Sequence, residues 1–175
     1  MVGYQHIIFP GRFQPISNAH ISRIRWIRER YPSSKVTIVI GDMGELSVVN
    51  FLTAEERGQI FRMLIKERGW NNVDLVSVQG CADGVEWAHR VKMAVPMADA
   101  VASDNPFVLE PLHAAGLFII KYERSGESCS LIRETPFSDW TKYIPLSEWK
   151  VLGNMSIERR MSSLSTGAKY PFMLA

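Results

Sequence analysis

Ten residues near the N-terminus carry side chains that could bind and polarise phosphate groups. They run from Gly11 to His20 and read Gly-Arg-Phe-Gln-Pro-Ile-Ser-Asn-Ala-His. Arg12 and His20 could supply positive charge, and a glycine at position 11 allows the backbone to approach a ligand closely. A helix that begins at about Asn18 would present its free N–H groups and the positive end of its dipole to the same place. This segment therefore favours phosphate binding.

The segment lies between an apolar run and an amphipathic stretch. Residues 6–9, His-Ile-Ile-Phe, are typical of a buried strand, and the residues after Asn18 have the apolar spacing of a helix. The phosphate-binding candidate is thus the turn at the carboxyl end of a first strand. In α/β sheets this is the place where ligands bind.

Strand and helix patterns alternate along the residues that follow. Further strands are predicted at 36–40, 73–78, 98–102 and 117–121, and helices at 54–68, 84–95 and 106–115. Thr53 and Glu56 form a capping-box pattern at the start of the first of these helices. Such alternation predicts an α/β fold with a Rossmann-like, parallel, five-stranded sheet and helices on both faces. The last third, from Ser128, shows no strand pattern and predicts a short helical C-terminal part.

Composition and length are those of an ordinary globular domain. The chain has 175 residues, of which 46% are hydrophobic and 22% charged, with a formal net charge of +2. We expect a single domain over residues 1–168 and a C-terminal tail over 169–175. The charge balance excludes a disordered polycation and argues against nucleic-acid binding. The one basic cluster, Arg23, Arg25, Arg28 and Arg30, is interpreted as a solvated helix face.

Cysteine usage and hydropathy indicate the compartment. Cys81 and Cys129 are far apart and have no companions at metal-ligand spacing, so neither a zinc site nor a disulfide framework is predicted. No stretch approaches the length of an apolar membrane span, and no leader pattern is present, so we expect no membrane partner. A reducing cytoplasmic location is the expectation.

The segment from Gly11 to His20 resembles the first motif of the nucleotidylyltransferase superfamily, and specifically that of archaeal-type nicotinamide mononucleotide (NMN) adenylyltransferases, G-R-F-Q-P-x-H-x-G-H. Ser17 stands in place of the first histidine and Ala19 in place of the glycine, so the H-x-G-H part is degenerate. In the family the histidines stabilise charge on the phosphates, and the glycine leaves room for adenine. A serine hydroxyl donates only a neutral hydrogen bond, about half as strong as a charge-assisted one. We therefore expect slower chemistry with binding retained.

Two central segments resemble the same family. Residues 50–57, Asn-Phe-Leu-Thr-Ala-Glu-Glu-Arg, are similar to a family segment whose arginine faces the phosphates, which implies that role for Arg57. The alternative is a solvated arginine on a capped surface helix. Trp87 matches a family tryptophan that lies against the nicotinamide ring, where an aromatic face attracts the cationic pyridinium. The alternative is a core residue that shares a helix face with Val91. Residues 78–83 depart from the family pattern Ile-Pro-Asp-Ile.

Two later segments complete the resemblance. Residues 102–106, Ala-Ser-Asp-Asn-Pro, are similar to the family's Thr-Asn-Asn-Pro, where polar groups meet the adenosine, and Asn105 also suits a turn into a helix. Residues 128–133, Ser-Cys-Ser-Leu-Ile-Arg, are similar to its Ser-x-Thr-x-Ile-Arg. Serines can cap a helix start there, and Arg133, one turn further on, could reach the β- and γ-phosphates.

The resemblance implies the nucleotidylyltransferase fold and an adenylyltransferase of NAD (pyridine nucleotide) biosynthesis that joins ATP and NMN into NAD and pyrophosphate. It implies Mg²⁺ that arrives with ATP, no protein metal ligand, and a homo-oligomer. The implied catalytic residues are His20, Arg12 and Arg133. The implied nucleotide-binding residues are Gly11, Phe13, Gln14, Ser17, Arg57, Trp87, Asn105, Ser128 and Ser130.

Two alternatives stay open at this point. The first is a catalytically weak nucleotide-binding protein, which the degenerate motif favours and the retained positive charges oppose. The second is a nucleotidyltransferase with a different phosphate acceptor, which the departure at residues 78–83 permits.

Overall fold

A five-stranded parallel sheet forms the centre of the computed structural model, which describes residues 3–122 and 126–166. Its strands are β1 (His6–Gly11), β2 (Lys35–Asp42), β3 (Val73–Gln79), β4 (Ala100–Ala102) and β5 (Phe118–Ile120). They lie in the order β3-β2-β1-β4-β5, and each neighbouring pair is parallel. The predicted fold class is confirmed. Because the order of the strands reverses between β1 and β4, the crevice at their carboxyl ends is where this sheet would receive a ligand.

Successive residues of β1 supply two different cores. Ile7 and Phe9 belong to the core on one face of the sheet, and Ile8 belongs to the core on the other. Side chains of a strand alternate between faces, so a continuous apolar run is what a strand covered on both sides needs. The apolar runs of β1 and β2 were the signal for buried parallel strands.

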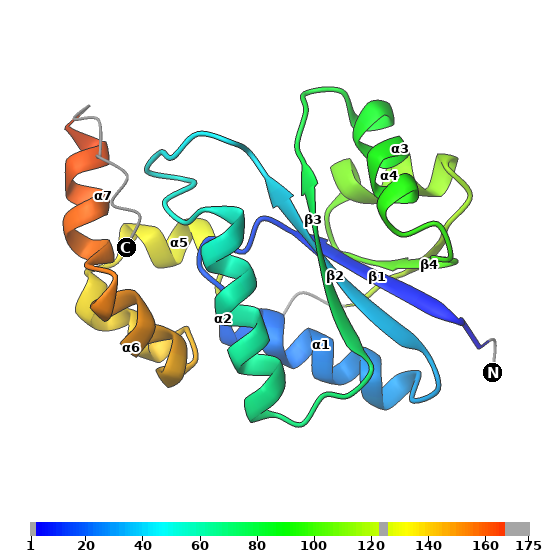
Figure 1. Ribbon diagram of the computed structural model, residues 1–175, viewed down its shortest axis with the longest axis horizontal. Helices are drawn as coiled ribbons and strands as arrows, with labels where there is room; N and C mark the ends of the chain where they lie inside the picture. Colours follow the sequence, from blue (N-terminus) through cyan, green and yellow to red (C-terminus); the bar gives the residue numbers. More distant parts are fainter. Residues whose placement is uncertain (1–2, 123–125, 167–175) are drawn as a thin grey trace.

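Helices cover both faces, as the alternation predicts (Figure 1). The helices α1 (Asn18–Arg30) and α2 (Ala54–Glu67) bury residues in the first core, and α3 (Gly84–Ala94) and α4 (Pro106–Ala114) bury residues in the second. Both the predicted start of α1 and the capping box of α2 are confirmed: Thr53 Oγ1 accepts from Glu56 N, and Glu56 Oε2 accepts from Thr53 N.

The two short strands are shorter than predicted. The fourth begins at Ala100 rather than at residue 98. Asp99 N donates to His6 O at 3.0 Å, and the Asp99 carboxylate also binds the start of β1. It accepts hydrogen bonds from Gln5 N and His6 N at 2.8 and 3.0 Å. The chain just before it is still in a turn, in which Ala98 N donates to Val95 O.

The C-terminal part is helical, as expected. It contains α5 (Cys129–Glu134), the 3₁₀ helix η1 (Phe137–Lys142), α6 (Leu146–Asn154) and α7 (Ile157–Ser165), which lie beside α2 (Figure 1). Trp140, Leu152 and Ile157 are buried in the first core, so these helices extend it. The predicted tail at 169–175 lies outside the described residues. None of the helices in the described ranges is long and apolar enough to span a bilayer.

Candidate functional site

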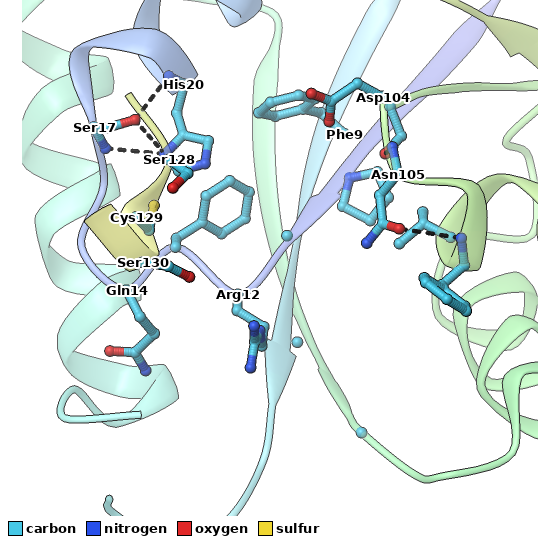
Figure 2. Close-up of a pocket in the computed structure, with 18 of the residues that line it drawn as sticks. Phe9, Arg12, Gln14, Ser17, His20, Asp104, Asn105, Ser128, Cys129 and Ser130 are labelled. Carbon is cyan, nitrogen blue, oxygen red and sulfur yellow. Dashed lines mark hydrogen bonds between the residues drawn. The ribbon is translucent and has the colours of Figure 1, made fainter. Parts of the chain in front are cut away.

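A cavity of about 600 Å³ opens at the carboxyl ends of β1 and β4. It is bounded by the loop between β1 and α1, the first turns of α1, the starts of α3 and α4, and residues 126–133. The structure brings almost all the predicted site residues to this cavity, Arg57 being the exception (Figure 2). Those that line it are Gly11, Arg12, Phe13, Gln14, Ser17, His20, Trp87, Asn105, Ser128, Ser130 and Arg133.

His20 is held by a capping box at the start of α1. Ser17 is the N-cap residue, and its backbone N–H donates to Nδ1 of His20 at 2.9 Å. A backbone N–H can only donate, so Nδ1 is an acceptor and the proton of the neutral ring is on Nε2. No hydrogen-bond partner for Nε2 occurs in the described ranges of the chain. Figure 2 shows these contacts on the cavity wall.

The environment of His20 keeps its ring neutral. Burial and, to a smaller extent, the nearby Arg23 cation lower the pKa of His20 from 6.5 to about 3, against the opposing effect of the Asp104 carboxylate. The ring also packs edge-on against Phe13, with centroids 4.9 Å apart. The sequence suggested that His20 brings positive charge. The structure corrects this: at neutral pH His20 offers a neutral Nε2–H donor.

Ser17 is committed to the cap. Its side chain is buried, and its Oγ accepts from His20 N at 3.3 Å and lies 3.0 Å from Nδ1. Because Nδ1 is an acceptor, the hydroxyl hydrogen of Ser17 points to it. The expected weak hydrogen bond from Ser17 to a phosphate is therefore replaced, in this structure, by a hydrogen bond that orients His20.

Arg133 and Arg12 bring cationic groups to the same wall. Arg133 Nη1 donates to Gln14 O at 2.6 Å, and Nη2 donates to Ser130 Oγ at 3.3 Å. Burial lowers the pKa of Arg133, and the proximity of Arg12 lowers it too, against the effect of Cys129. The guanidinium of Arg12 has neither a hydrogen bond nor an ion pair within the described part of the chain. Two cations that repel each other in a half-buried site are a suitable receptor for a polyanion.

The helix start that carries Ser128 and Ser130 is capped locally. Ser128 is the N-cap of α5 and its Oγ accepts from Leu131 N at 3.2 Å. The serine-rich segment is therefore a helix start, as the sequence predicted. It places Arg133 on the cavity one turn later.

Arg57 does not line the cavity. Its side chain is 2% exposed, and its guanidinium donates to Arg12 O at 2.6 Å, to Gly41 O at 2.8 Å and, through Nε, to Thr53 O at 3.1 Å. Asp42 lies 4.0 Å away, and burial lowers the pKa of Arg57 to about 10. The structure therefore differs from both sequence interpretations: Arg57 neither faces a phosphate nor is solvated. It joins the carboxyl ends of β1 and β2 to the start of α2.

Arg23 is a lining residue that the sequence interpretation missed. It was grouped with a solvated face, but its side chain is only 12% exposed and Nη2 lies 3.6 Å from Asp104 Oδ2. Its guanidinium also lies 4.9 Å from the ring centroid of Tyr122. The signal was present, since positions three apart share a helix face and Arg23 follows His20 by three. Arg28 is likewise not simply solvated, because it lies over Trp70.

The opposite wall is formed by α3 and α4. Trp87 lines the cavity and also packs against the second core, so the ligand and core interpretations are compatible. Asn105 is the N-cap of α4, with its Oδ1 accepting from Phe107 N at 3.1 Å. Figure 2 shows Asn105 on the side of the cavity away from Ser128 and Ser130.

The structure shows what the small residues Gly11 and Ala19 contact, which the sequence did not reveal. A Cβ at Gly11 would lie 2.7 Å from Cζ of Phe13, whose φ is +53°, so the Phe13 ring requires glycine there. The Ala19 methyl does not line the cavity. It faces Gly126, where a Cβ would lie 3.1 Å from it.

Comparison with known proteins finds archaeal proteins that are similar to this chain over most of its length. No family model matches the chain. It is 27% identical over 169 residues to a nicotinamide-nucleotide adenylyltransferase of Ignicoccus hospitalis, covering 90% of this chain and 96% of that protein. It is 27% identical over 177 residues to the Pyrobaculum arsenaticum protein of the same name, covering 94% and 96%. The chain resembles archaeal nicotinamide-nucleotide adenylyltransferases over most of its length. The resemblance inferred from the motifs is confirmed.

Solved structures share the fold. A bifunctional NMN adenylyltransferase/ADP ribose pyrophosphatase of Francisella tularensis superposes with a TM-score of 0.73 at 16% identity, covering 93% of this chain and 53% of that chain. The present chain thus spans about half of the bifunctional protein. A nicotinic acid mononucleotide adenylyltransferase of Plasmodium falciparum gives a TM-score of 0.55 at 12% identity, covering 87% and 96%. The predicted nucleotidylyltransferase fold is confirmed.

Proposed function

We propose that this protein is a nucleotidyltransferase that moves the adenylyl group of ATP to NMN, giving NAD and pyrophosphate. The observation that supports this best is the meeting of His20, Arg12 and Arg133 on one cavity at the ends of the parallel strands. The archaeal relatives that carry this activity in their names are similar along nearly the whole chain. We also propose one domain over residues 1–168, since the C-terminal helices share the first core.

The proposed step is a single displacement. A phosphate oxygen of NMN attacks the α-phosphorus of ATP, the bond from that phosphorus to the bridging oxygen of pyrophosphate breaks, and pyrophosphate leaves with the electron pair. No protein group is covalently modified. Catalysis then consists of aligning the two phosphates and neutralising the charge that moves to the leaving group.

His20, Arg12 and Arg133 take distinct roles in this proposal. His20 donates its Nε2–H to the α-phosphate, in the orientation that the Ser17 amide imposes on the ring. Arg12 and Arg133 receive the β- and γ-phosphates as permanent cations. A neutral imidazole contributes less charge than a cation, which agrees with the slower chemistry expected from the degenerate motif.

Mg²⁺ is proposed to enter with ATP. The Francisella neighbour was crystallised with AMP and a manganese ion. The described residues of this chain include no group of three or more His, Cys, Asp or Glu side chains that could hold a metal ion. Triphosphate oxygens and water suit Mg²⁺ as ligands, and the ion would supply charge neutralisation there.

A second candidate is a nucleotide-binding protein with little transferase activity. The specific observation in its favour is the Ser17 hydroxyl, which is engaged with His20 and leaves the α-phosphate with one neutral donor from this loop. The cations of the cavity would still bind a nucleotide in this case.

One assay separates the two candidates. Purified protein is given ATP, NMN and Mg²⁺, and both NAD and pyrophosphate are followed, for the wild type, His20→Ala and His89→Ala. His89 is exposed on α3 and away from the cavity, so it serves as the matched control. Product that depends on His20 but not on His89 supports the transferase. No product, with thermal stabilisation by ATP or NMN, supports the binding protein. The same stabilisation experiment with other nucleotide acceptors tests a different acceptor.

A further inference from the structure

Glu148 is a fully buried carboxyl group that the proposed reaction does not use. It lies on α6, has no solvent exposure, and is far in sequence from the cavity residues of the N-terminal loop. Its Oε1 accepts a hydrogen bond from Ile16 N at 2.9 Å, across 132 residues of sequence. Its Oε2 has no hydrogen-bond partner among the described residues. A buried carboxyl is expensive, so this contact calls for a functional reason.

The amide that binds Glu148 lies one residue before the amide that orients His20. Glu148 accepts from the amide of Ile16, and the next amide, that of Ser17, donates to Nδ1 of His20 at 2.9 Å. The peptides that carry the Ile16 and Ser17 amides meet at the Cα of Ile16. Holding the Ile16 N–H on Glu148 therefore restricts the direction in which the Ser17 N–H points. Ile16 is itself fully buried, and water cannot replace the carboxyl as its acceptor.

Other C-terminal groups hold the same loop. Arg133 binds Gln14 O, Cys129 Sγ donates to Pro15 O at 3.3 Å, and Asn18 N donates to Tyr143 O at 2.7 Å. Among the described residues, Glu148 is the group that accepts from the Ile16 N–H. Its removal would therefore leave the N–H of the Pro15–Ile16 peptide without an acceptor, while the carbonyl of that peptide keeps its contact with Cys129.

We propose that Glu148 is a positioning residue for His20: by accepting from the Ile16 amide it directs the Ser17 amide onto Nδ1 and so reserves Nε2–H for the substrate phosphate. The effect on the His20 ring follows from the structure alone. The effect on catalysis rests on the proposed function.

The chemistry of the Glu148 carboxyl predicts which substitution keeps an acceptor for the Ile16 amide. Burial raises the pKa of Glu148 well above its ordinary value, against the effects of the Ile16 amide and Arg68, and so favours the neutral carboxylic acid. Glutamine has the same shape and the same carbonyl acceptor without a charge. Methionine fills similar volume but offers no comparable acceptor, and aspartate draws the acceptor back by one methylene.

The experiment reads the His20 ring directly. Full-length protein labelled with ¹⁵N-histidine is compared by NMR for wild type, Glu148→Gln and Glu148→Met, and steady-state kinetics with ATP, NMN and Mg²⁺ are measured in parallel. In the wild type we expect a protonated Nε2 and an unprotonated Nδ1. Glu148→Gln should keep this pattern and most of kcat. Glu148→Met should give mixed tautomers and lower kcat about tenfold, with a smaller change in KM.

A matched control separates positioning from stability. Leu152→Ala removes a fully buried side chain from the same helix and contacts neither Ile16 nor Ser17 through a hydrogen bond, so it should lower Tm but keep the His20 tautomer and kcat. A folded Glu148→Met protein with the wild-type ¹⁵N pattern overturns the proposal, as does Glu148→Gln behaving like Glu148→Met. Glu148→Asp gives the same comparison if Glu148→Met does not fold. If the wild type makes no NAD, the proposed function fails while the NMR comparison still decides the positioning role.

Discussion

His20 shows how a short local motif can set the chemistry of a side chain. A cap residue and the third residue of α1 exchange hydrogen bonds, and the result is an imidazole with one defined tautomer. Phosphate transfer would then depend on a neutral donor and two permanent cations rather than on histidine protonation. This arrangement has measurable consequences at single residues.

The first concerns pH. With its pKa near 3, His20 should remain neutral from pH 8 to about pH 5, so its NMR signals should not titrate in that range. A folded-state pKa below the unfolded value of 6.5 favours the native state above that pH, and this contribution is lost as the pH falls from 6.5 toward 3. Comparing the pH dependence of unfolding in wild type and His20→Ala checks the sign. Titration of His20 near pH 6.5 in the free protein would contradict the assignment.

The second concerns Arg133. Removing a donor that acts on the transition state typically lowers kcat by about 10²–10³-fold, and we expect this of Arg133→Ala. Arg133→Lys should recover only part, because lysine cannot bind Gln14 O and a phosphate with the same fork. Arg25→Ala is the control, since Arg25 is exposed on α1 and away from the cavity. An unchanged kcat in Arg133→Ala would remove this residue from the mechanism.

At the scale of elements, the carboxyl ends of β1 and β2 are joined to α2 by one side chain. Arg57 reaches the carbonyls of Arg12, Gly41 and Thr53, and so fixes the backbone from which the Arg12 side chain enters the cavity. It serves the site without lining it.

Its removal should therefore cost stability first. Arg57→Met removes a buried guanidinium and leaves the partly buried carbonyls of Arg12 and Gly41 without these donors, and we expect a loss of about 2–4 kcal/mol in the free energy of unfolding, measured with urea. Arg62→Met on the same helix breaks only an exposed ion pair with Glu55 and should cost less than about 1 kcal/mol. Equal losses in the two variants would mean that the buried contacts of Arg57 contribute little.

At the scale of the whole molecule, the C-terminal helices hold the rest of the chain through contacts that include Glu148 and Arg160. Glu148 on α6 holds the loop before α1, and Arg160 on α7 binds both carboxylate oxygens of Glu56 at 2.8 Å and donates to Phe51 O at 3.0 Å. The second link reaches the capping box of α2. Stability and site geometry are therefore coupled across the molecule.

The carboxyl groups of Glu56 and Glu148 should make the stability of the protein depend on pH in opposite directions. Burial alone would raise the pKa of Glu56, but Arg160 and the Thr53 cap lower it overall, so its contribution to stability is present above about pH 4.5 and is lost in acid. The raised pKa of Glu148 means that its contribution is full below about pH 4.5 and is lost as the pH rises. Relative to wild type, Arg160→Met should therefore lose most stability at neutral pH, and Glu148→Gln should gain as the pH rises. Thermal unfolding at pH 3 and pH 8 tests Arg160→Met, and thermal unfolding at pH 5 and pH 8 tests Glu148→Gln. A pH-independent difference for either variant would contradict its assignment.

Much of the fold and part of the candidate site were determined by the sequence alone. The order of strands and helices, the helix starts at Asn18 and Ser128, and the capping box at Thr53 depend on neighbours within a few residues, so they can be predicted from local patterns. The motif residues could also be gathered in advance, because the carboxyl ends of parallel strands meet at one edge of the sheet.

Only the tertiary structure decided what several of these side chains do. Arg57 turns inward to backbone carbonyls, Arg23 turns to the cavity, and His20 is neutral, because burial and partners distant in sequence determine each of these states. Glu148 is the clearest case. In the sequence it is an ordinary acidic residue on a helix, and only the tertiary packing makes it a buried acceptor for the Ile16 amide with a raised pKa. Local sequence pattern specifies which residues reach the cavity, whereas desolvation and contacts distant in sequence set the charge of their side chains and the direction in which they point.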